Sequence, residues 1–346
     1  MHTTQKETLP LIAQASDVRE DDIMRLPPAL LEALLRDHTT GQNIIWATDD
    51  YAELGEGYTF HDQITPERIT GTQGNLIKPR TDKTQDVQVG RKRDKAEIFT
   101  PAWICNAQLN LIDTAWFGRK DAFNSERAGH TWTATEGRIV FSEEKGKTWR
   151  DYVRTPRLEI TCGEGPYLAS RYDSTTGEAI PIENRVGIID RKLRVVGENT
   201  ESSGDWLLWA HEALMSTYGY EWQGDSLLLA RESLLASFIE YYRAKFATDP
   251  LEKSSRYAAY IISWNVWQMD GLKGVVPESC GDKPSGHRNL LGEDELCSCE
   301  GCRTGNIRAH NGTYCLIRDW HAKPLKGGTG PGRKMRFIDL MKRGDV

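Results

Sequence analysis

Residues 157–165, with the sequence RLEITCGEG, form a short β-type run that stops at a cysteine-glycine turn. The segments that follow alternate in character along the chain. Apolar residues at helical spacing predict helices, and short β-rich runs predict strands. The expected elements are a helix over 205–215, a strand over 218–222, helices over 225–242 and 254–262, and a strand over 263–267. Strand, helix, strand, helix, strand is typical of a doubly wound α/β sheet.

Each expected strand is followed by residues that can bind a ligand. Gly163 and Gly165 follow the first strand, Glu221 closes the second, and Asp270 follows the third. In an open α/β sheet, ligands bind beyond the carboxyl ends of the strands. Glycines let the backbone approach a ligand closely, one acid can accept both ribose hydroxyls, and a third polar group can meet the amine of an adenine. The pattern therefore favours a site for an adenosine-containing cofactor.

The spacing of the cofactor residues implies an insertion. Glu221 follows Gly163 at a much greater separation than the about 20 residues of a compact dinucleotide-binding unit. An insertion over roughly 172–204 is therefore expected. The polar stretch 71–95 is either a solvated loop or a strap that contacts phosphates, because it ends in the basic residues Arg91, Lys92, Arg93 and Lys95. Further predicted elements are helices over 27–36 and 101–116, a short strand that runs into a loop over 43–51, and a strand over 137–141.

Four segments together resemble a known family. They are Phe99-Thr100-Pro101, LEITCGEGPYL at 158–168, GYEW at 219–222 and NVWQMDGL at 265–272. In order and content they resemble the cofactor motifs of amino-group (N6-adenine or N4-cytosine type) S-adenosylmethionine-dependent DNA methyltransferases. The chain looks like the methyltransferase-type subunits of restriction–modification systems. The resemblance covers roughly residues 95–272.

The resemblance implies a Rossmann-like class I methyltransferase sheet and assigns roles to its motif residues. Phe99, Thr100 and Pro101 would shape the cofactor pocket; core packing is the alternative for Phe99. Glu221 would bind the ribose, and Asp270 would bind the adenine amine unless it serves as a turn residue before Gly271. The backbone of one loop would lie against the methionine moiety of the cofactor, and Glu164 would bind its amino group. The residues of this loop are Cys162, Gly163, Glu164 and Gly165.

The family's catalytic loop is missing from this chain. Amino methyltransferases carry an Asn/Asp/Ser-Pro-Pro-aromatic loop, which accepts hydrogen bonds from the target amine and stacks on the flipped base. The one Pro-Pro pair here, Pro27-Pro28, precedes a helix-like segment. Catalytic residues therefore remain unassigned. Either an unrecognised loop acts in its place, or a partner chain supplies it, or the chain is a cofactor-binding relative without activity.

The cysteines gather near the end of the chain. Five of the seven lie between 280 and 315, and Cys299-Glu-Gly-Cys302 forms a CxxC pair. Because a CxxC turn supplies two of the four tetrahedral ligands of zinc, a structural zinc site is predicted. A loop cluster of reduced cysteines is the alternative. The preferred ligands are Cys280, Cys299, Cys302 and Cys315, with His310 or Cys297 as substitutes. A zinc-stabilised nuclease is a further possibility, suggested by Asn306, His310, Asn311 and His321.

Composition limits the function classes. The 346 residues carry 44 basic and 50 acidic side chains, a net charge of −6, which argues against a histone-like polyanion binder. A local basic groove for DNA remains compatible with it, and the basic residues 333–343 are either part of one or a solvated tail. No apolar run is long enough for a membrane span, and no secretion signal is recognised. A cytoplasmic location is expected.

These observations predict three regions: an N-terminal region with a polar and basic linker (1–94), a methyltransferase-like cofactor-binding domain (95–275), and a cysteine-rich zinc module with a basic tail (276–346). The leading hypothesis is an S-adenosylmethionine-binding DNA methyltransferase, or a modification-type subunit of a restriction–modification or phage-defence system. It would work with DNA and partner subunits. The alternatives are a non-catalytic methyltransferase-like DNA-binding or specificity subunit, and the nuclease.

Overall fold

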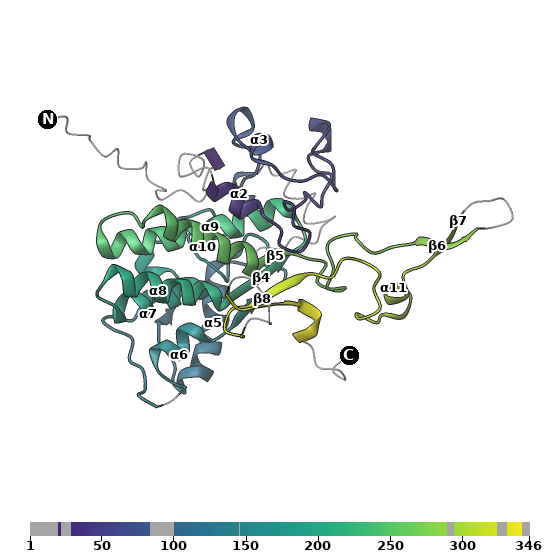
Figure 1. The fold of residues 1–346 in the computed structure, drawn as a ribbon. Helices are drawn as coiled ribbons and strands as arrows, with labels where there is room; N and C mark the ends of the chain where they lie inside the picture. Colours follow the sequence, from purple (N-terminus) through teal and green to yellow (C-terminus); the bar gives the residue numbers. More distant parts are fainter. Residues whose placement is uncertain are drawn as a thin grey trace.

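The computed structural model describes residues 20–21, 29–83, 100–144, 146–288, 294–323 and 331–340. These residues form a mixed α/β structure with small sheets, some of them antiparallel (Figure 1). The predicted α/β class is confirmed at this level. Phe99 and the basic cluster at 91–95 lie outside the described residues. No helix among the described residues is long and apolar enough to cross a membrane.

A three-stranded parallel sheet positions the site. Its order is β3-β4-β5, and the residue pairs Glu159–Gly219 and Glu221–Gln268 fix its register. Each crossover between its strands contains two helices. The elements, in chain order, are β3 (Arg157–Glu159), α7 (Ile188–Asn199), α8 (Ser203–Met215), β4 (Thr217–Glu221), α9 (Gly224–Phe246), α10 (Glu252–Asn265) and β5 (Val266–Gln268). The predicted alternation of strands and helices is therefore present.

Two buried clusters cover the sheet. The larger one joins the crossover helices to the N-terminal helix α2 (Ala29–Leu35). The smaller one lies under the antiparallel hairpin of β8 (Leu316–Asp319) and β9 (Arg333–Arg336). Its members are Tyr220, Trp267, Met269, Cys315 and Ile317.

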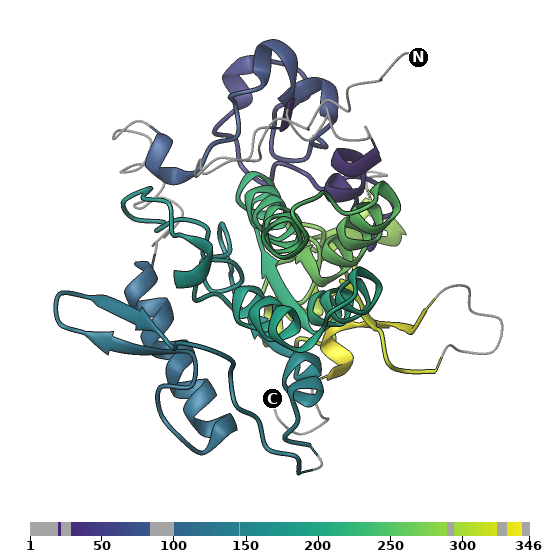
Figure 2. The same ribbon diagram turned by 90° about the vertical axis from the view of Figure 1, so that its left-hand side faces the viewer.

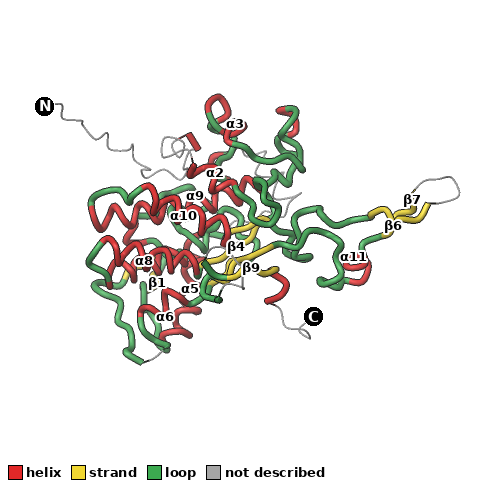
Figure 3. The backbone as a smooth tube through the Cα atoms, viewed as in Figure 1, coloured by secondary structure: helices red, strands yellow, loops and turns green. Residues whose placement is uncertain are grey.

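Peripheral elements surround this body. Figure 2 shows the hairpin β1–β2 beside α5, and Figure 3 shows the hairpin β6–β7 projecting from the body. Asn106 of α5 exchanges side-chain hydrogen bonds with Asn124 of β1, at 2.8 and 2.9 Å. The bounds are α3 (Pro66–Ile69), α5 (Ala102–Phe117), β1 (Asn124–Arg127), β2 (Thr131–Ala134), α6 (Trp149–Arg154), β6 (Lys283–Arg288), β7 (Asp294–Cys297) and α11 (Glu300–Thr304).

Two predicted strands are wrong, and both segments bond to side chains instead. Residues 137–141 form no strand, because the N–H of Ile139 donates to the Glu198 carboxylate at 2.8 Å. Residues 43–51 make only isolated bridges. There the N–H of Ile45 donates to Gln268 Oε1 at 2.9 Å, and its carbonyl accepts from Gln268 Nε2 at 2.8 Å. A glutamine at the end of β5 thus takes the place of a neighbouring strand.

Arg231 on α9 links three parts of the core. Its buried guanidinium donates to the carbonyls of Val266 at 2.7 Å, Ser263 at 3.2 Å and Arg36 at 3.1 Å, and also to that of Leu34. Burial lowers its pKa to about 10, so the side chain stays charged at neutral pH. Carbonyls from the end of α2, the end of α10 and the start of β5 therefore converge on one cation.

Replacing Arg231 with Met should destabilise the whole fold. Several buried carbonyls would lose their donor, which costs on the order of 3 kcal/mol or more in the free energy of unfolding. Urea unfolding followed by tryptophan fluorescence measures this. Arg256→Met on the exposed face of α10 is the matched control and should change little. Equal stability of the two variants would contradict the role given to Arg231.

Candidate functional site

The loop after β3 makes a tight turn toward the ends of the strands. The N–H of Cys162 donates to the Tyr220 carbonyl at 2.8 Å, and the N–H of Gly165 donates back to the Cys162 carbonyl at 2.7 Å. Gly163 and Gly165 both have positive φ, 54° and 76°. A Cβ on Gly165 would lie 3.2 Å from the Cβ of Ala230 on α9. Glycine at this position therefore allows both the left-handed backbone and the close approach to the helix.

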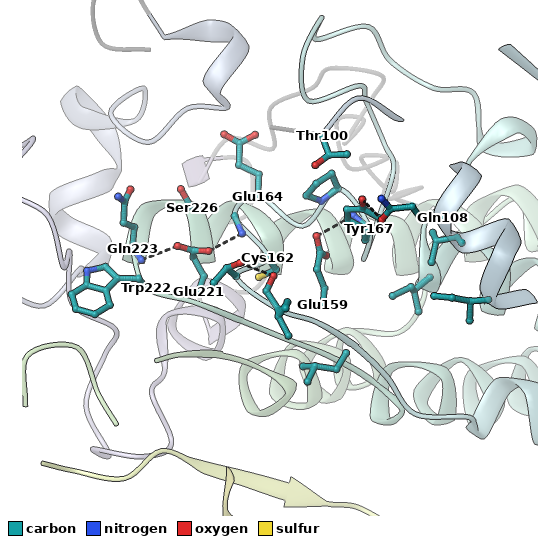
Figure 4. Close-up of a pocket in the computed structure, with 18 of the residues that line it drawn as sticks. Thr100, Gln108, Glu159, Cys162, Glu164, Tyr167, Glu221, Trp222, Gln223 and Ser226 are labelled. Carbon is teal, nitrogen blue, oxygen red and sulfur yellow. Dashed lines mark hydrogen bonds between the residues drawn. The ribbon is translucent and has the colours of Figure 1, made fainter. Parts of the chain in front are cut away.

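The glycine loop and the acid of the second strand meet. Glu221 Oε2 accepts from the N–H of Gly163 at 2.8 Å, and its Oε1 accepts from the N–H of Gln223 at 3.2 Å (Figure 4). This contact follows from the register, because Glu221 ends β4 beside the end of β3. Burial raises the pKa of Glu221, although the N–H groups of Gly163 and Gln223 oppose that rise.

A cavity of about 1060 Å³ opens at these strand ends. In Figure 4, Glu221, Trp222 and Gln223 lie at one end and Gln108 and Tyr167 at the other. The described residues that line the cavity include no Lys or Arg. They do include four glutamates, Glu159, Glu164, Glu221 and Glu278. The cavity is therefore suited to a cationic or neutral ligand and poorly suited to a phosphate.

Two of these glutamates are held in place by neighbouring groups. Glu164 is buried, and its carboxylate accepts from the N–H of Arg80 at 2.7 Å and from the Tyr172 hydroxyl at 2.8 Å. Glu159 accepts from the N–H groups of Tyr167 and Leu168, at 3.3 and 3.0 Å. Burial raises the pKa of Glu159 well above its ordinary value, despite those two donors.

The structure brings together part of the predicted cofactor set. Thr100, Cys162, Gly163, Glu164 and Glu221 all line the cavity. Gly165 supports the turn beneath it, and Pro101 is the N-cap of α5, but neither is among the lining residues.

Asp270 lies away from the cavity. It is not among the described residues that line it, and its Oδ1 accepts from the N–H groups of Leu272 and Lys273, at 3.0 and 3.2 Å. Its Oδ2 is 3.3 Å from the ammonium of Lys273. The Asp270 side chain thus stabilises the turn after β5, which was the alternative role considered for it.

Several lining residues were missed at the sequence level. Phe60 reaches the cavity from the N-terminal region, and its ring packs edge-on against Trp222, with centroids 6.3 Å apart. No sequence signal links Phe60 to the strand ends, since only the folded chain brings it there. Glu159 was detectable in principle, because it is an acid at the end of the predicted first strand.

A second candidate site lies in the C-terminal region. The ligand atoms of Cys280, Cys299, Cys302 and His310 lie within 4.8 Å of one another, so this cluster could hold a metal ion. His310 Nδ1 is 3.5 Å from Cys299 Sγ and 3.7 Å from Cys302 Sγ. A Cβ on Gly301 would come within 2.6 Å of His310, so glycine between the two cysteines allows the histidine to approach.

The predicted ligand Cys315 is not part of this cluster. It is fully buried beside the sheet, and its thiol donates to the Gln268 carbonyl at 3.3 Å. The cause is its position directly before β8, which places it in the core under the hairpin. His310, considered as a substitute, takes the fourth place. Cys297, the other substitute, is exposed and lies outside the cluster.

Local contacts favour the thiolate of Cys299. Burial acts to raise its pKa, but hydrogen bonds from the N–H groups of Asn311 and Cys302 and from His310 outweigh burial and lower it to about 6. The N–H of Asn311 lies 3.4 Å from its sulfur. Because metals bind the thiolate form, the Cys299 sulfur is in the form that binds a metal at neutral pH.

Comparison with family models, with curated proteins and with solved structures finds no match for this chain.

Substitutions of individual ligands should show whether a metal binds to the observed cluster or to the ligand set predicted from the sequence. His310→Ala and Cys302→Ser should lose the bound metal, since each removes one of four ligands. Cys315→Ser and Cys297→Ser should retain it. Atomic absorption of protein purified with zinc in the buffer measures the metal-to-chain ratio. Retention of metal by His310→Ala together with its loss in Cys315→Ser would contradict the cluster.

Proposed function

We propose that the chain binds S-adenosylmethionine in the acid-lined cavity and acts as a DNA methyltransferase or as the modification-type subunit of a restriction–modification or phage-defence system. The cofactor would supply a methyl group on its sulfonium for transfer to an exocyclic amine of adenine or cytosine. The resemblance of the motifs at 99–101, 158–168 and 219–222 supports this proposal, as does a Rossmann-like interpretation of the β3-β4-β5 sheet.

The charge of the cavity carries the proposal. S-adenosylmethionine carries a sulfonium, an ammonium and one carboxylate, so its net charge is positive, and it has no phosphate. A cavity lined by four glutamates, with no Lys or Arg among its described lining residues, complements that charge. Phosphates bind to cations or at a helix N-terminus. The N-terminus of α9 lies at this cavity, but the N–H of its N-cap Gln223 already donates to Glu221, and its first turn contains Asp225, so it is a poor phosphate site. The contact of Gly163 with Glu221 supports the same ligand, because it places a ribose acceptor beside a close-approach backbone.

In this arrangement the two ends of the cavity would have different roles. Glu221 would accept the ribose hydroxyls, and the base would lie against Trp222 and Phe60, whose rings form one wall. In Figure 4, Glu159 lies between Glu221 and Tyr167, and Glu164 lies nearer to Glu221 and Ser226; the methionine ammonium would be placed near these two glutamates. Asp270 would take no direct part.

A non-catalytic relative is the second candidate. The absence of the Asn/Asp-Pro-Pro loop from the sequence favours it. Binding of the cofactor without methyl transfer to DNA would distinguish it. The nuclease has less support, because His310 lies among three thiols in the cluster and is not available there as a base.

We also propose that the ion in the Cys280, Cys299, Cys302 and His310 cluster is zinc with a structural role. Three thiolates and one imidazole are a common closed set for tetrahedral zinc. The cluster joins the start of the hairpin β6–β7 to α11 and to the loop before β8. It would stabilise a region with few buried apolar side chains.

Glu221→Gln should weaken S-adenosylmethionine binding by roughly tenfold or more, equivalent to about 1.4 kcal/mol. The amide loses the negative charge and offers one acceptor oxygen where the carboxylate offers two. Isothermal titration calorimetry measures the affinity. Asp270→Asn is the matched control and should bind as the wild type does. Unchanged affinity in Glu221→Gln would exclude this placement of the ribose, and failure of the wild type to bind would exclude the cofactor.

Cofactor binding should also weaken on acidification. The raised pKa of Glu221 means that its carboxylate takes up a proton at a higher pH than an ordinary glutamate does. Affinity for a cation is therefore full above that pKa and falls as the pH drops through it. Titrations across the acidic range should show this fall in the wild type and a weaker fall in Glu221→Gln. A pH-independent affinity would contradict an ionised Glu221 in the site.

A further inference from the structure

Positive charge gathers around the Trp264 ring at the end of α10. The imidazole of His38 stacks on this ring, with the two centroids 4.0 Å apart. The guanidinium carbon of Arg318 lies 4.6 Å from the centre of the same ring, and the ammonium of Lys334 lies 5.2 Å from it. These residues, His38, Arg318 and Lys334, together with Arg36, are called the His38 cluster below.

The hairpin β8–β9 brings two of these cations together. Arg318 and Lys334 lie directly opposite each other in its antiparallel register, whereas the next pair joins Asp319 to Arg333. Like charges directly opposite destabilise a strand pair, and opposite charges stabilise it. Arg318 is buried, its Nη1 donates to the Pro331 carbonyl at 2.7 Å, and its Nε has no hydrogen-bond partner among the described residues. The hairpin therefore contains a charge repulsion that its own register does not compensate.

Arg36 and Arg231 add two further cations beside His38. The pKa of His38 is lowered to about 3, first by burial and then by the positive charges of Arg231 and of the cluster. The adjacent acid, Asp37, is buried and accepts hydrogen bonds from the two threonines that follow His38. Neither Arg36 nor Lys334 forms an ion pair with a carboxylate in the described part of the chain. The positive charge of the cluster is thus left without an acidic partner there.

The cluster lies on an open surface, outside the acid-lined cavity. Arg36 and Lys334 are exposed, and His38 is half-buried. None of the cluster residues lines the cavity at the strand ends or either of two smaller cavities. Because the whole chain has a net charge of −6, this concentration of positive charge is local. The exposed cations of the cluster are accessible to an anion from the solvent.

We propose that the His38 cluster binds a phosphate group. Phosphate offers several strong acceptor oxygens, which the donors of Arg36 and Lys334 can share. Its negative charge would offset the repulsion between Lys334 and Arg318 and would be attracted by the buried cations Arg318 and Arg231. The proposal does not rest on the proposed function, because the cluster lies outside the cofactor cavity.

Two sources share this ligand chemistry: a free phosphate compound and the backbone of a nucleic acid. The open surface favours the backbone, because small ligands bind preferentially in enclosed pockets. A backbone also presents successive phosphates to cations that are spread over a surface.

Two probes, each added to the full chain at low salt, test the site and separate the sources. Isothermal titration calorimetry measures the binding of inorganic pyrophosphate, and fluorescence polarisation measures that of a short labelled DNA duplex of mixed sequence. Lys334→Gln and Arg36→Gln should each weaken binding by roughly three- to tenfold. For the duplex, each should also reduce the slope of log affinity against log salt by about one. Lys120→Gln, at an exposed cation beyond the end of α5, is the matched control and should bind as the wild type does.

Duplex binding that depends on Lys334 and Arg36 would assign the site to a nucleic-acid backbone. Pyrophosphate binding alone, with the same dependence, would assign it to a free phosphate compound. If neither probe binds, or if either substitution leaves binding unchanged, the proposal is wrong. S-adenosylmethionine is absent from both assays, so their outcome is independent of the cofactor.

Stability of the free protein separates a binding role from a purely structural one. A structural role for Lys334 on the Trp264 ring requires Lys334→Gln to destabilise the fold. Under the proposal, the substitution removes a repulsion from Arg318, so urea unfolding should show equal or higher stability. Lower stability of Lys334→Gln without ligand would contradict the uncompensated charge on which the proposal rests.

Discussion

The site depends on the parallel pairing of β3 with β4. The pairing of Glu159 with Gly219 brings the end of β4 level with the turn that follows β3. Only in this register can the N–H of Gly163 donate to Glu221. A shift of one residue would turn Glu221 to the opposite face, because side chains alternate along a strand. The register of the sheet therefore sets the positions of the residues that line the cavity. The helices of the two crossovers pack against that sheet.

The glutamates of the cavity carry a cost in folding free energy as well as a candidate role in binding. Burying carboxylates is unfavourable unless donors compensate. Here backbone N–H groups donate hydrogen bonds to the buried carboxyl groups. Those of residues 167 and 168 donate to Glu159, and those of residues 163 and 223 donate to Glu221. The strand ends carry these carboxyl groups with no Lys or Arg among the described lining residues, and burial raises the pKa of Glu159 and of Glu221.

Among the described residues, two separate buried clusters pack against the sheet. The larger cluster spans the crossover helices and the N-terminal helix α2, and Arg231 joins these parts through backbone carbonyls. The smaller cluster under β8–β9 ends at β4. Leu158 and Ile160 are exposed and line the cavity.

The sequence by itself determined the order of the core elements and the residues at two strand ends. Apolar periodicity located α8, α9 and α10, and the glycine loop with Glu221 was correctly grouped, because strand ends of a parallel sheet meet at one edge. Only the tertiary structure decided which long-range partners complete each site. In the fold, Phe60 lines the cavity, and the Asp270 side chain bonds within the turn after β5. His310 lies beside the three cysteines, whereas Cys315 is buried in the core. Local patterns do not encode these outcomes, because each depends on packing between segments far apart in the chain.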